Sequence, residues 1–237
     1  MPTRGCEPQV RLSAIVFDLG GVLLDAEEAH ANAARLAAQD FSLPVSVAEW
    51  ECIRGSAYED FFYRVLASPA NIHRRADLHE LVARAYDLYL EQVVDSADLI
   101  PYALEALKVS RASFEFVAVA TSSEGRLVDT VLRRFHLTEY FDCVVSGDHL
   151  TQKKPAPEAF LVVAWLLGIK PGSMVVVEDS EPGIRAARLA RTHVVKIDSK
   201  GDDQASLAVR AHQVVRGHRE LIAYIRALEE RKVLDGR

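Results

Sequence analysis

Short apolar runs that end in polar turns recur along this chain. The three clearest are Ala14–Phe17 before Asp18, Phe116–Ala120 before Thr121-Ser122-Ser123, and Met174–Val177 before Glu178-Asp179-Ser180. Continuous apolar runs of this length are typical of strands that are buried on both faces of a parallel sheet. Because open α/β sheets bind ligands outside the carboxyl ends of their strands, we expect the three endings to meet at one site.

From Pro101 onward, strand-like and helix-like segments alternate. Helices are predicted at 103–109, 124–135, 157–167, 182–190 and 219–232, and strands at 114–120, 143–146, 174–177 and 193–197, with a short last strand at 214–215. One further strand, at 12–18, is predicted near the start of the chain. Alternation of this kind indicates βαβ units that build a parallel sheet.

The segment between the first strand and Pro101 has a different texture. It is rich in Ala, Leu, Glu and Arg, and apolar residues recur at helical spacing over 27–39, 59–66 and 78–94. We therefore predict an α/β fold with a Rossmann-like parallel-sheet core and an inserted all-helical cap domain. The core would comprise residues 1–25 and 101–237, and the cap residues 26–100.

Composition and charge indicate which partners and which compartment to expect. The 237 residues carry 28 Lys and Arg against 34 Asp and Glu, a net charge of −6, and no basic stripe, so no nucleic-acid partner is expected. No apolar run approaches the ~20 residues of a membrane helix, and the first twelve residues do not resemble a signal peptide. The three widely spaced cysteines fit a reducing compartment. We expect a cytoplasmic protein without a membrane partner, either a monomer or a homodimer.

The polar turns each allow a structural and a chemical interpretation. Asp18, the Thr121 turn and Asp179 are all placed where a helix-capping side chain would be, and Lys154 fits a solvated lysine. The chemical interpretation is favoured where two acids adjoin, because Glu178 and Asp179 at a buried strand end repel each other unless a cation is bound. Adjacent glycines after Asp18 and a helix start after Ser123 both suit an anion. Together these features indicate a divalent cation and a phosphate.

The order of the motifs resembles that of the haloacid dehalogenase superfamily. The similarity is to the branch with a helical cap after the first strand, and most closely to the β-phosphoglucomutase-like sugar phosphatases, over about Val10 to Asp198. The motifs that carry it are Phe17-Asp18-Leu19-Gly20-Gly21-Val22-Leu23, Thr121, Lys154-Pro155-Ala156-Pro157-Glu158, and Glu178-Asp179-Ser180-Glu181-Pro182-Gly183-Ile184-Arg185-Ala186-Ala187.

The resemblance implies a Mg²⁺-dependent phosphatase acting on a small phosphorylated metabolite, with a sugar phosphate as the expected class. Asp18 would attack phosphorus and form an aspartyl-phosphate. Mg²⁺ would be held by Asp18, the backbone carbonyl of Gly20 and Asp179, with Glu178 close by. The residues that would hold the phosphoryl oxygens are Thr121, the Ser122 backbone and Lys154.

One position departs from the family pattern. Family phosphatases usually carry a second aspartate two residues after the nucleophile, as general acid and base, and this chain has Gly20 there. Loss of such a group typically costs ~10²–10⁴-fold in rate. Three interpretations stay open: a slow or substrate-assisted phosphatase, a phosphatase whose acid comes from elsewhere, and a non-catalytic phospho-ligand-binding or regulatory protein on the same scaffold.

The cap supplies three candidate substrate contacts. The segment Asp25–His30 resembles the family's entry into the cap, and His30, which titrates near neutrality, is the first candidate for a substitute acid. Arg54 lies in a segment that resembles the substrate-specificity loop. Either Arg54 or Arg84 would bind a second anionic group of the substrate. Structural roles for the histidine and surface roles for the arginines are the alternatives.

Overall fold

The computed structural model describes residues 12–53, 57–198 and 211–235, and the chain divides into two compact units. The first, called here the sheet unit, holds the described residues up to Leu23 and those from Leu99 on. The second, the helical unit, is Leu24–Asp98. Among the described residues, no helix has both the length and the apolar character to span a bilayer.

A six-stranded sheet forms the centre of the sheet unit. Its strands are β1 (Ala14–Phe17), β4 (Phe116–Ala120), β5 (Cys143–Val145), β6 (Met174–Glu178), β7 (His193–Ile197) and β8 (Gln213–Val215), in the order β5-β4-β1-β6-β7-β8 with parallel pairing. Every residue of β1 and β6 is buried, which accounts for the apolar runs Ala14–Phe17 and Met174–Val177.

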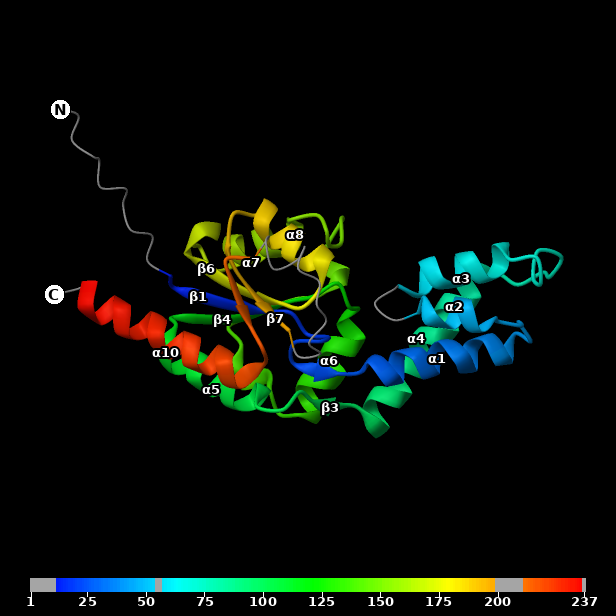
Figure 1. Ribbon diagram of the computed structural model, residues 1–237, viewed down its shortest axis with the longest axis horizontal. Helices are drawn as coiled ribbons and strands as arrows, with labels where there is room; N and C mark the ends of the chain where they lie inside the picture. Colours follow the sequence, from blue (N-terminus) through cyan, green and yellow to red (C-terminus); the bar gives the residue numbers. More distant parts are fainter. Residues whose placement is uncertain (1–11, 54–56, 199–210, 236–237) are drawn as a thin grey trace, which may run out of the picture. The chain divides into compact units, whose positions relative to one another are not determined.

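Helices cover both faces of this sheet. The helices are α5 (Ala103–Ser113), α6 (Gly125–Arg134), α7 (Glu158–Leu166), α8 (Glu181–Leu189) and α10 (His218–Asp235), with short 3-10 turns at Thr138–Tyr140, Gly147–His149 and Pro171–Ser173. Figure 1 shows α7 and α8 on one face and α5 and α10 on the other. The buried residues of α7 and α8 share one core cluster with β1, β4 and β6.

The strand order brings the predicted polar endings together. β1 lies between β4 and β6, in a register that pairs Phe17 with Val119 on one side and with Val177 on the other. The turns that follow these three strands therefore leave the same edge of the sheet at neighbouring positions. The predicted α/β fold with a parallel sheet and a helical insert is confirmed.

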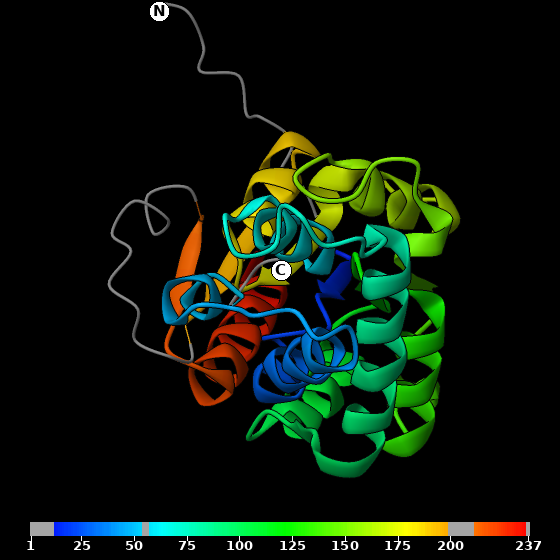
Figure 2. The same cartoon turned by 90° about the vertical axis from the view of Figure 1, so that its right-hand side faces the viewer.

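The helical unit is built from α1 (Glu27–Asp40), α2 (Val47–Glu51), α3 (Tyr58–Ala67) and α4 (Leu78–Ser96), with β2 (Leu24–Asp25) and β3 (Asp98–Leu99) paired as a two-stranded sheet. α1 and α4 pack against each other (Figure 2). Small alanines of α1 lie against aromatic and aliphatic side chains of α3 and α4. Asp77 caps α4 by accepting from the backbone N–H groups of His79 and Glu80.

Candidate active site

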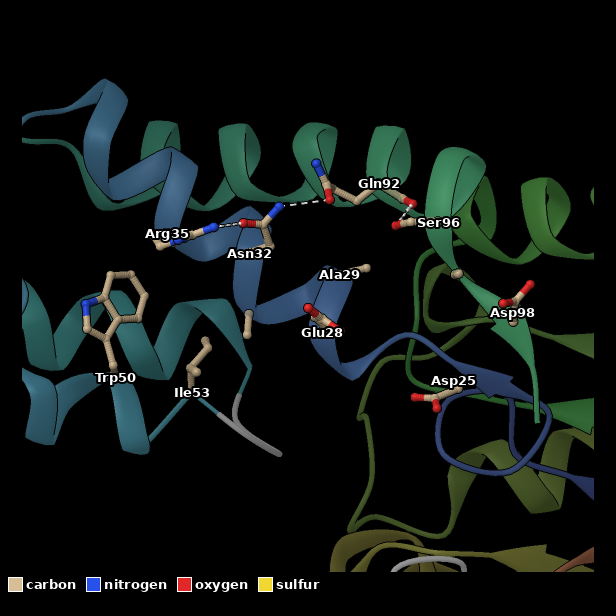
Figure 3. A pocket seen from close by; sticks show the side chains of 12 residues that line it. Asp25, Glu28, Ala29, Asn32, Arg35, Trp50, Ile53, Gln92, Ser96 and Asp98 are labelled. Carbon is tan, nitrogen blue, oxygen red and sulfur yellow. Dashed lines mark hydrogen bonds between the residues drawn. The ribbon is translucent and has the colours of Figure 1, made fainter. Parts of the chain in front are cut away.

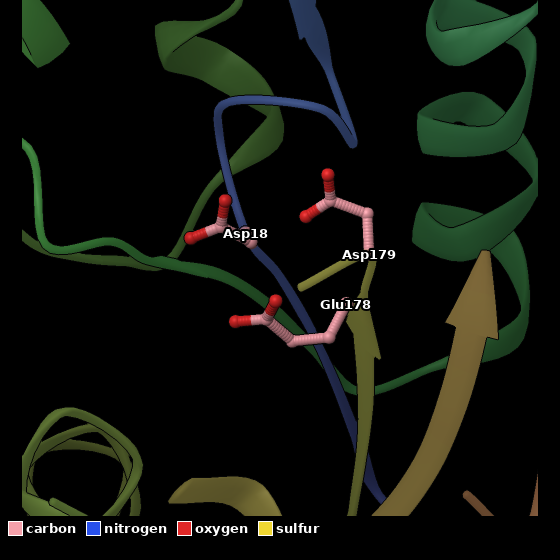
Figure 4. Close-up of side chains that lie close together, drawn as sticks. All are labelled: Asp18, Glu178 and Asp179. Carbon is pink, nitrogen blue, oxygen red and sulfur yellow. The ribbon is translucent and has the colours of Figure 1, made fainter. Parts of the chain in front are cut away.

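Three carboxylates meet at the carboxyl edge of the sheet. Asp18 follows β1, and Glu178 and Asp179 lie at the end of β6; one oxygen from each lies within 4.8 Å of the others (Figure 4). Glu178 is fully buried, and Asp18 is 9% exposed. Closely spaced carboxylate oxygens of this kind are hard ligands, which suit Mg²⁺ or Ca²⁺.

Lys154 links two of these carboxylates to the neighbouring strand. Its Nζ lies 2.5 Å from Asp18 Oδ1 and 2.5 Å from Glu178 Oε1, and it donates to the carbonyl of Ala120 at 2.9 Å. Three partners use all three donors of an ammonium group. Burial works to lower the pKa of Lys154, but the charges of Asp18 and Glu178 outweigh it and raise that pKa above its ordinary value.

The cluster carries more negative than positive charge. When ionised, the three carboxylates face one ammonium group, and burial together with the charges of Glu178 and Asp18 raises the pKa of Asp179 to about 8. Burial also raises the pKa of Glu178. A divalent cation would balance the remaining two charges and keep Asp179 ionised, so the donor set fits such an ion.

Two glycines permit the close approach of the carboxylates to the backbone. Gly21 has φ +74°, and a Cβ there would lie 1.9 Å from Asp179 Oδ2. A Cβ on Gly183 would lie 2.0 Å from Glu178 Oε1. Any other residue at either position would displace a carboxylate, and at Gly21 it would also adopt a left-handed backbone that side chains disfavour.

Ser180 resolves an ambiguity that the sequence left open. It is the N-cap of α8, and its Oγ accepts from the Gly183 N–H at 3.1 Å and donates to Glu178 Oε2 at 3.2 Å. Asp179 is therefore not the helix cap and remains available to the cluster. Glu178, with Lys154 on one oxygen and Ser180 on the other, is held in a fixed orientation.

The turn after β4 carries two buried hydroxyl groups. Thr121 is buried, and its Oγ1 accepts from the Ser123 N–H at 3.2 Å. The Ser122 Oγ is buried and has no hydrogen-bond partner among the described residues. A buried hydroxyl without a partner is costly, and a phosphoryl oxygen is a suitable acceptor for it.

A separate turn supplies the cap of the following helix. Asp148 Oδ2 accepts from the Gly125 N–H at 2.9 Å at the start of α6, and the Gly147 N–H donates to the Ser123 carbonyl at 2.7 Å. The hydroxyl groups of residues 121–123 do not cap α6, which was their structural interpretation. Sequence reasoning missed Asp148, because a cap contributed from 23 residues away leaves no local pattern.

Gly20 lies open beside the cluster. It is exposed, its φ is not in the left-handed region, and a Cβ built on it would meet nothing within 4 Å. A side chain is therefore tolerated at this position, in contrast to Gly21.

Two of the predicted cap residues, His30 and Arg84, belong to the helical unit and not to the carboxylate cluster. His30, on α1, stacks on Tyr58 with ring centroids 4.1 Å apart and contacts the edge of Tyr89. Burial lowers the pKa of His30 to about 4. Arg84 forms an exposed ion pair with Asp40 at 2.8 Å. Arg54 lies outside the described residues.

The helical unit also contains a polar pocket of about 830 Å³ (Figure 3). Its lining combines carboxylates, amides, a guanidinium and an indole: Asp25, Glu28, Asp98, Asn32, Gln92, Arg35 and Trp50. Asn32 Nδ2 donates to Gln92 Oε1 at 2.9 Å, which links α1 to α4 across the pocket. Asp25 and Glu28 belong to the segment Asp25–His30 that the sequence singled out, whereas no sequence motif marked the other five residues, which come from separate elements.

Comparison with known proteins gives a consistent family. The family model described as haloacid dehalogenase-like hydrolase matches residues 15–197. The fructose-1-phosphate phosphatase YqaB of Escherichia coli K12 is 31% identical over 189 residues, which cover 79% of this chain and 97% of that protein. The phosphorylated carbohydrates phosphatase of Thermotoga maritima is 30% identical over 213 residues, covering 86% of this chain and 94% of that protein.

The fold has close counterparts among solved structures. The crystal structure of CbbY from Rhodobacter sphaeroides in complex with phosphate superposes with a TM-score of 0.76 at 21% identity, covering 89% of this chain and 96% of that one. At this level of identity the likeness shows the fold, and both the sheet and the helical insert are included in it.

Proposed function

Because this chain belongs to the family of haloacid dehalogenase-like hydrolases, we propose that it hydrolyses the phosphate ester of a small phosphorylated metabolite, with sugar phosphates as the preferred class. The observation that carries the proposal is the position of Lys154 Nζ, 2.5 Å from Asp18 and 2.5 Å from Glu178, beside Asp179. The relatives that are sugar phosphatases support the substrate class.

Asp18 is the proposed nucleophile. Lys154 holds its Oδ1, and we assign the attack to Oδ2, which forms a bond to phosphorus as the bond to the leaving oxygen breaks. Water then attacks phosphorus, releases inorganic phosphate and regenerates the carboxylate. The charge of Lys154 lowers the repulsion between Asp18 and an incoming phosphate dianion.

The turn after β4 is the proposed phosphate-binding loop. Thr121 and Ser122 lie at the carboxyl end of the strand next to Asp18, and the buried Ser122 hydroxyl lacks a partner among the described residues. The N-terminus of α6 follows directly, and a helix N-terminus favours anions.

Mg²⁺ is the proposed cofactor. Asp18, Asp179 and the Gly20 carbonyl would hold it, and Glu178 would act mainly by holding Lys154, since both of its oxygens accept hydrogen bonds. When bound, the cation would offset the negative charge that develops on the phosphoryl oxygens. Hard carboxylate oxygens of this spacing fit that choice.

Gly20 favours a second candidate function. Without an acid at this position the leaving alkoxide lacks a proton donor, and a protein that binds phosphorylated ligands without turnover would keep all the other groups. His30 is a poor replacement acid, since its lowered pKa leaves the ring neutral near pH 7.

A phosphometabolite panel separates the two functions. We expect the purified protein with Mg²⁺ to release phosphate from at least one sugar phosphate, Asp18→Asn to abolish that release, and the exposed Asp129→Asn to leave it unchanged. Metal-dependent binding of a phosphorylated ligand by calorimetry, without hydrolysis over hours, would establish the binding function instead. Release by Asp18→Asn at the wild-type rate would refute the assigned nucleophile.

A further inference from the structure

Helix α7 is apolar on its outer side as well as on its inner side. Four inner residues are buried in the core of the sheet unit: Ala159, Phe160, Val163 and Ala164. On the outer side, Leu161 is 44% exposed, Trp165 is 78% exposed and Leu166 is 52% exposed. Helices that are hydrophobic all round are normally buried on all sides. Among the described residues, none covers the outer side of α7, although its sequence is typical of a helix that is buried on all sides.

The neighbouring helix also carries an exposed apolar side chain. α8 contacts α7, lies beside it in Figures 1 and 2, and carries Leu189 at 57% exposure. We call Leu161, Trp165, Leu166 and Leu189 the α7 patch. Together these four residues expose an area on the order of 500 Å², which is comparable to the largest apolar patch on a typical monomer, often a functional one, and to the apolar share of one side of a standard protein interface.

The charges that flank the patch favour a second copy of the same chain. Between Glu158 and Lys170, at the two ends of the α7 segment, no residue is charged. The Glu158 carboxylate is fixed by the backbone N–H groups of Thr151 and Gln152, at 2.9 and 2.7 Å. Lys170 is exposed. Two copies of α7 packed antiparallel about a twofold axis would bring each Glu158 near Lys170 of the other copy.

We propose that this protein forms a homodimer in which the α7 patches of two chains face each other. In this arrangement Leu161 packs against Trp165 of the second copy, and the antiparallel helices also place opposite ends of their dipoles side by side. The interface uses none of the residues assigned to hydrolysis, so it stands independently of the proposed function.

Sedimentation of three proteins across a wide concentration range tests the proposal. We expect the wild type to sediment at twice the mass of the chain, Trp165→Glu to sediment as a monomer, and Tyr63→Glu to remain a dimer. Tyr63, on α3 of the helical unit, is a matched control because it is an aromatic residue that is 67% exposed. Circular dichroism and phosphate release by Trp165→Glu would show that the variant is folded.

Tryptophan fluorescence tests the location of the contact. The chain has two tryptophans, so Trp50→Phe leaves Trp165 as the reporter. We expect iodide to quench Trp165 weakly at high protein concentration and strongly after dilution. A wild type that stays monomeric, a dimer that persists in Trp165→Glu, or quenching that does not change with dilution would each overturn the proposal. If the protein is monomeric and Trp165 is protected from iodide only when phospholipid vesicles or another protein are added, the α7 patch binds that partner and not a second copy of the chain.

Discussion

Gly20 and Gly21 are adjacent in sequence but meet different constraints. A Cβ on Gly21 would lie 1.9 Å from Asp179 Oδ2 and would sit on a backbone with φ +74°, whereas a Cβ on Gly20 would meet nothing within 4 Å. At position 21 glycine is therefore required by the nearby Asp179 and by the left-handed backbone. At position 20 there is no steric requirement for glycine. Substitutions at the two positions should separate these effects.

Gly21→Ala should impair the site without unfolding the sheet unit. The left-handed backbone costs about 1–2 kcal/mol for a residue with a side chain, and the displaced Asp179 should lower kcat by about 100-fold and raise the Mg²⁺ concentration needed for half-maximal rate. Gly20→Ala is the matched control and should keep the wild-type stability. Steady-state kinetics against Mg²⁺ and urea unfolding measure both variants, and equal losses in the two would contradict the steric argument.

Gly20→Asp should add the missing acid. The open space and the ordinary φ of Gly20 tolerate the side chain. We expect kcat to rise about 10-fold or more for alkyl phosphates, whose leaving groups need a proton, and to change little for aryl phosphates. Gly20→Asn is the matched control, because it has the same shape and no acid, and it should show no gain.

Other outcomes of the Gly20→Asp experiment are equally informative. Equal gains for alkyl and aryl phosphates would mean that leaving-group protonation is not limiting. No gain, with the fold and Mg²⁺ affinity intact, would mean that another group already supplies the proton. His30→Ala would then be measured, and unchanged activity would remove His30 from the mechanism.

Individual site residues differ in how far the sequence could predict them. Asp18, Lys154, Glu178 and Asp179 follow strand or loop ends in a recognisable order, and the structure brings their side chains together. Their chemical roles stay predictions. Which of Asp179 and Ser180 caps α8 could not be read from the sequence, because both residue types cap helices and only the fold places one Oγ against the Gly183 N–H.

At the scale of elements, the start of α6 depends on a residue from another turn. Asp148→Ala should remove the acceptor of the Gly125 N–H and lower the free energy of unfolding by about 0.5–2 kcal/mol. Because Gly125 follows the phosphate-binding loop, KM should rise as well. Asp148→Asn keeps an acceptor oxygen and should retain most of the stability. Urea unfolding and KM check the pair; unchanged values in Asp148→Ala would show that water satisfies the helix start.

Long periodic elements were predicted well, and three of the shortest elements were missed. α1, α3 and α4 agree with the predicted helices to within two residues, and β7 agrees at both ends. The five-residue α2 and the two-residue strands β2 and β3 were not predicted. Elements this short hold less than two periods of hydrophobic pattern, and α2 is stabilised by a capping box between Ser46 and Glu49.

At the scale of the whole molecule, the two units carry different chemistry. The described carboxylates and ammonium of the candidate site all belong to the sheet unit, while the helical unit carries the aromatic cluster around His30 and the polar pocket. We propose that the helical unit is the cap domain. The family and the fold class could be predicted because the order of the motifs along the chain does not depend on local propensities, and both predictions are confirmed.

The pH dependence of stability should report one buried histidine of the sheet unit. Burial lowers the pKa of His218, which is 2% exposed, to about 4. An unfolded histidine takes up its proton near 6.5, so between pH 6.5 and 4 the unfolded state binds more protons and the folded state loses stability. At pH 5 this loss is about 2 kcal/mol relative to pH 7.5.

His218→Gln should remove that loss, and the difference from the wild type isolates it. The wild-type curve alone does not, because His30, whose pKa is also lowered to about 4, adds a similar loss. Asp179, with a pKa raised to about 8, acts in the opposite direction, since it binds its proton more tightly in the folded state and stabilises the fold as the pH falls. Between pH 7.5 and pH 5, the free energy of unfolding of His218→Gln should therefore rise by about 2 kcal/mol relative to that of the wild type, as measured by urea unfolding. The exposed His73→Gln is the control and should run parallel to the wild type. If the stability of His218→Gln also ran parallel to that of the wild type, the folded and unfolded imidazole would have the same pKa, and the effect of burial on that pKa would have to be offset by a partner such as Glu105.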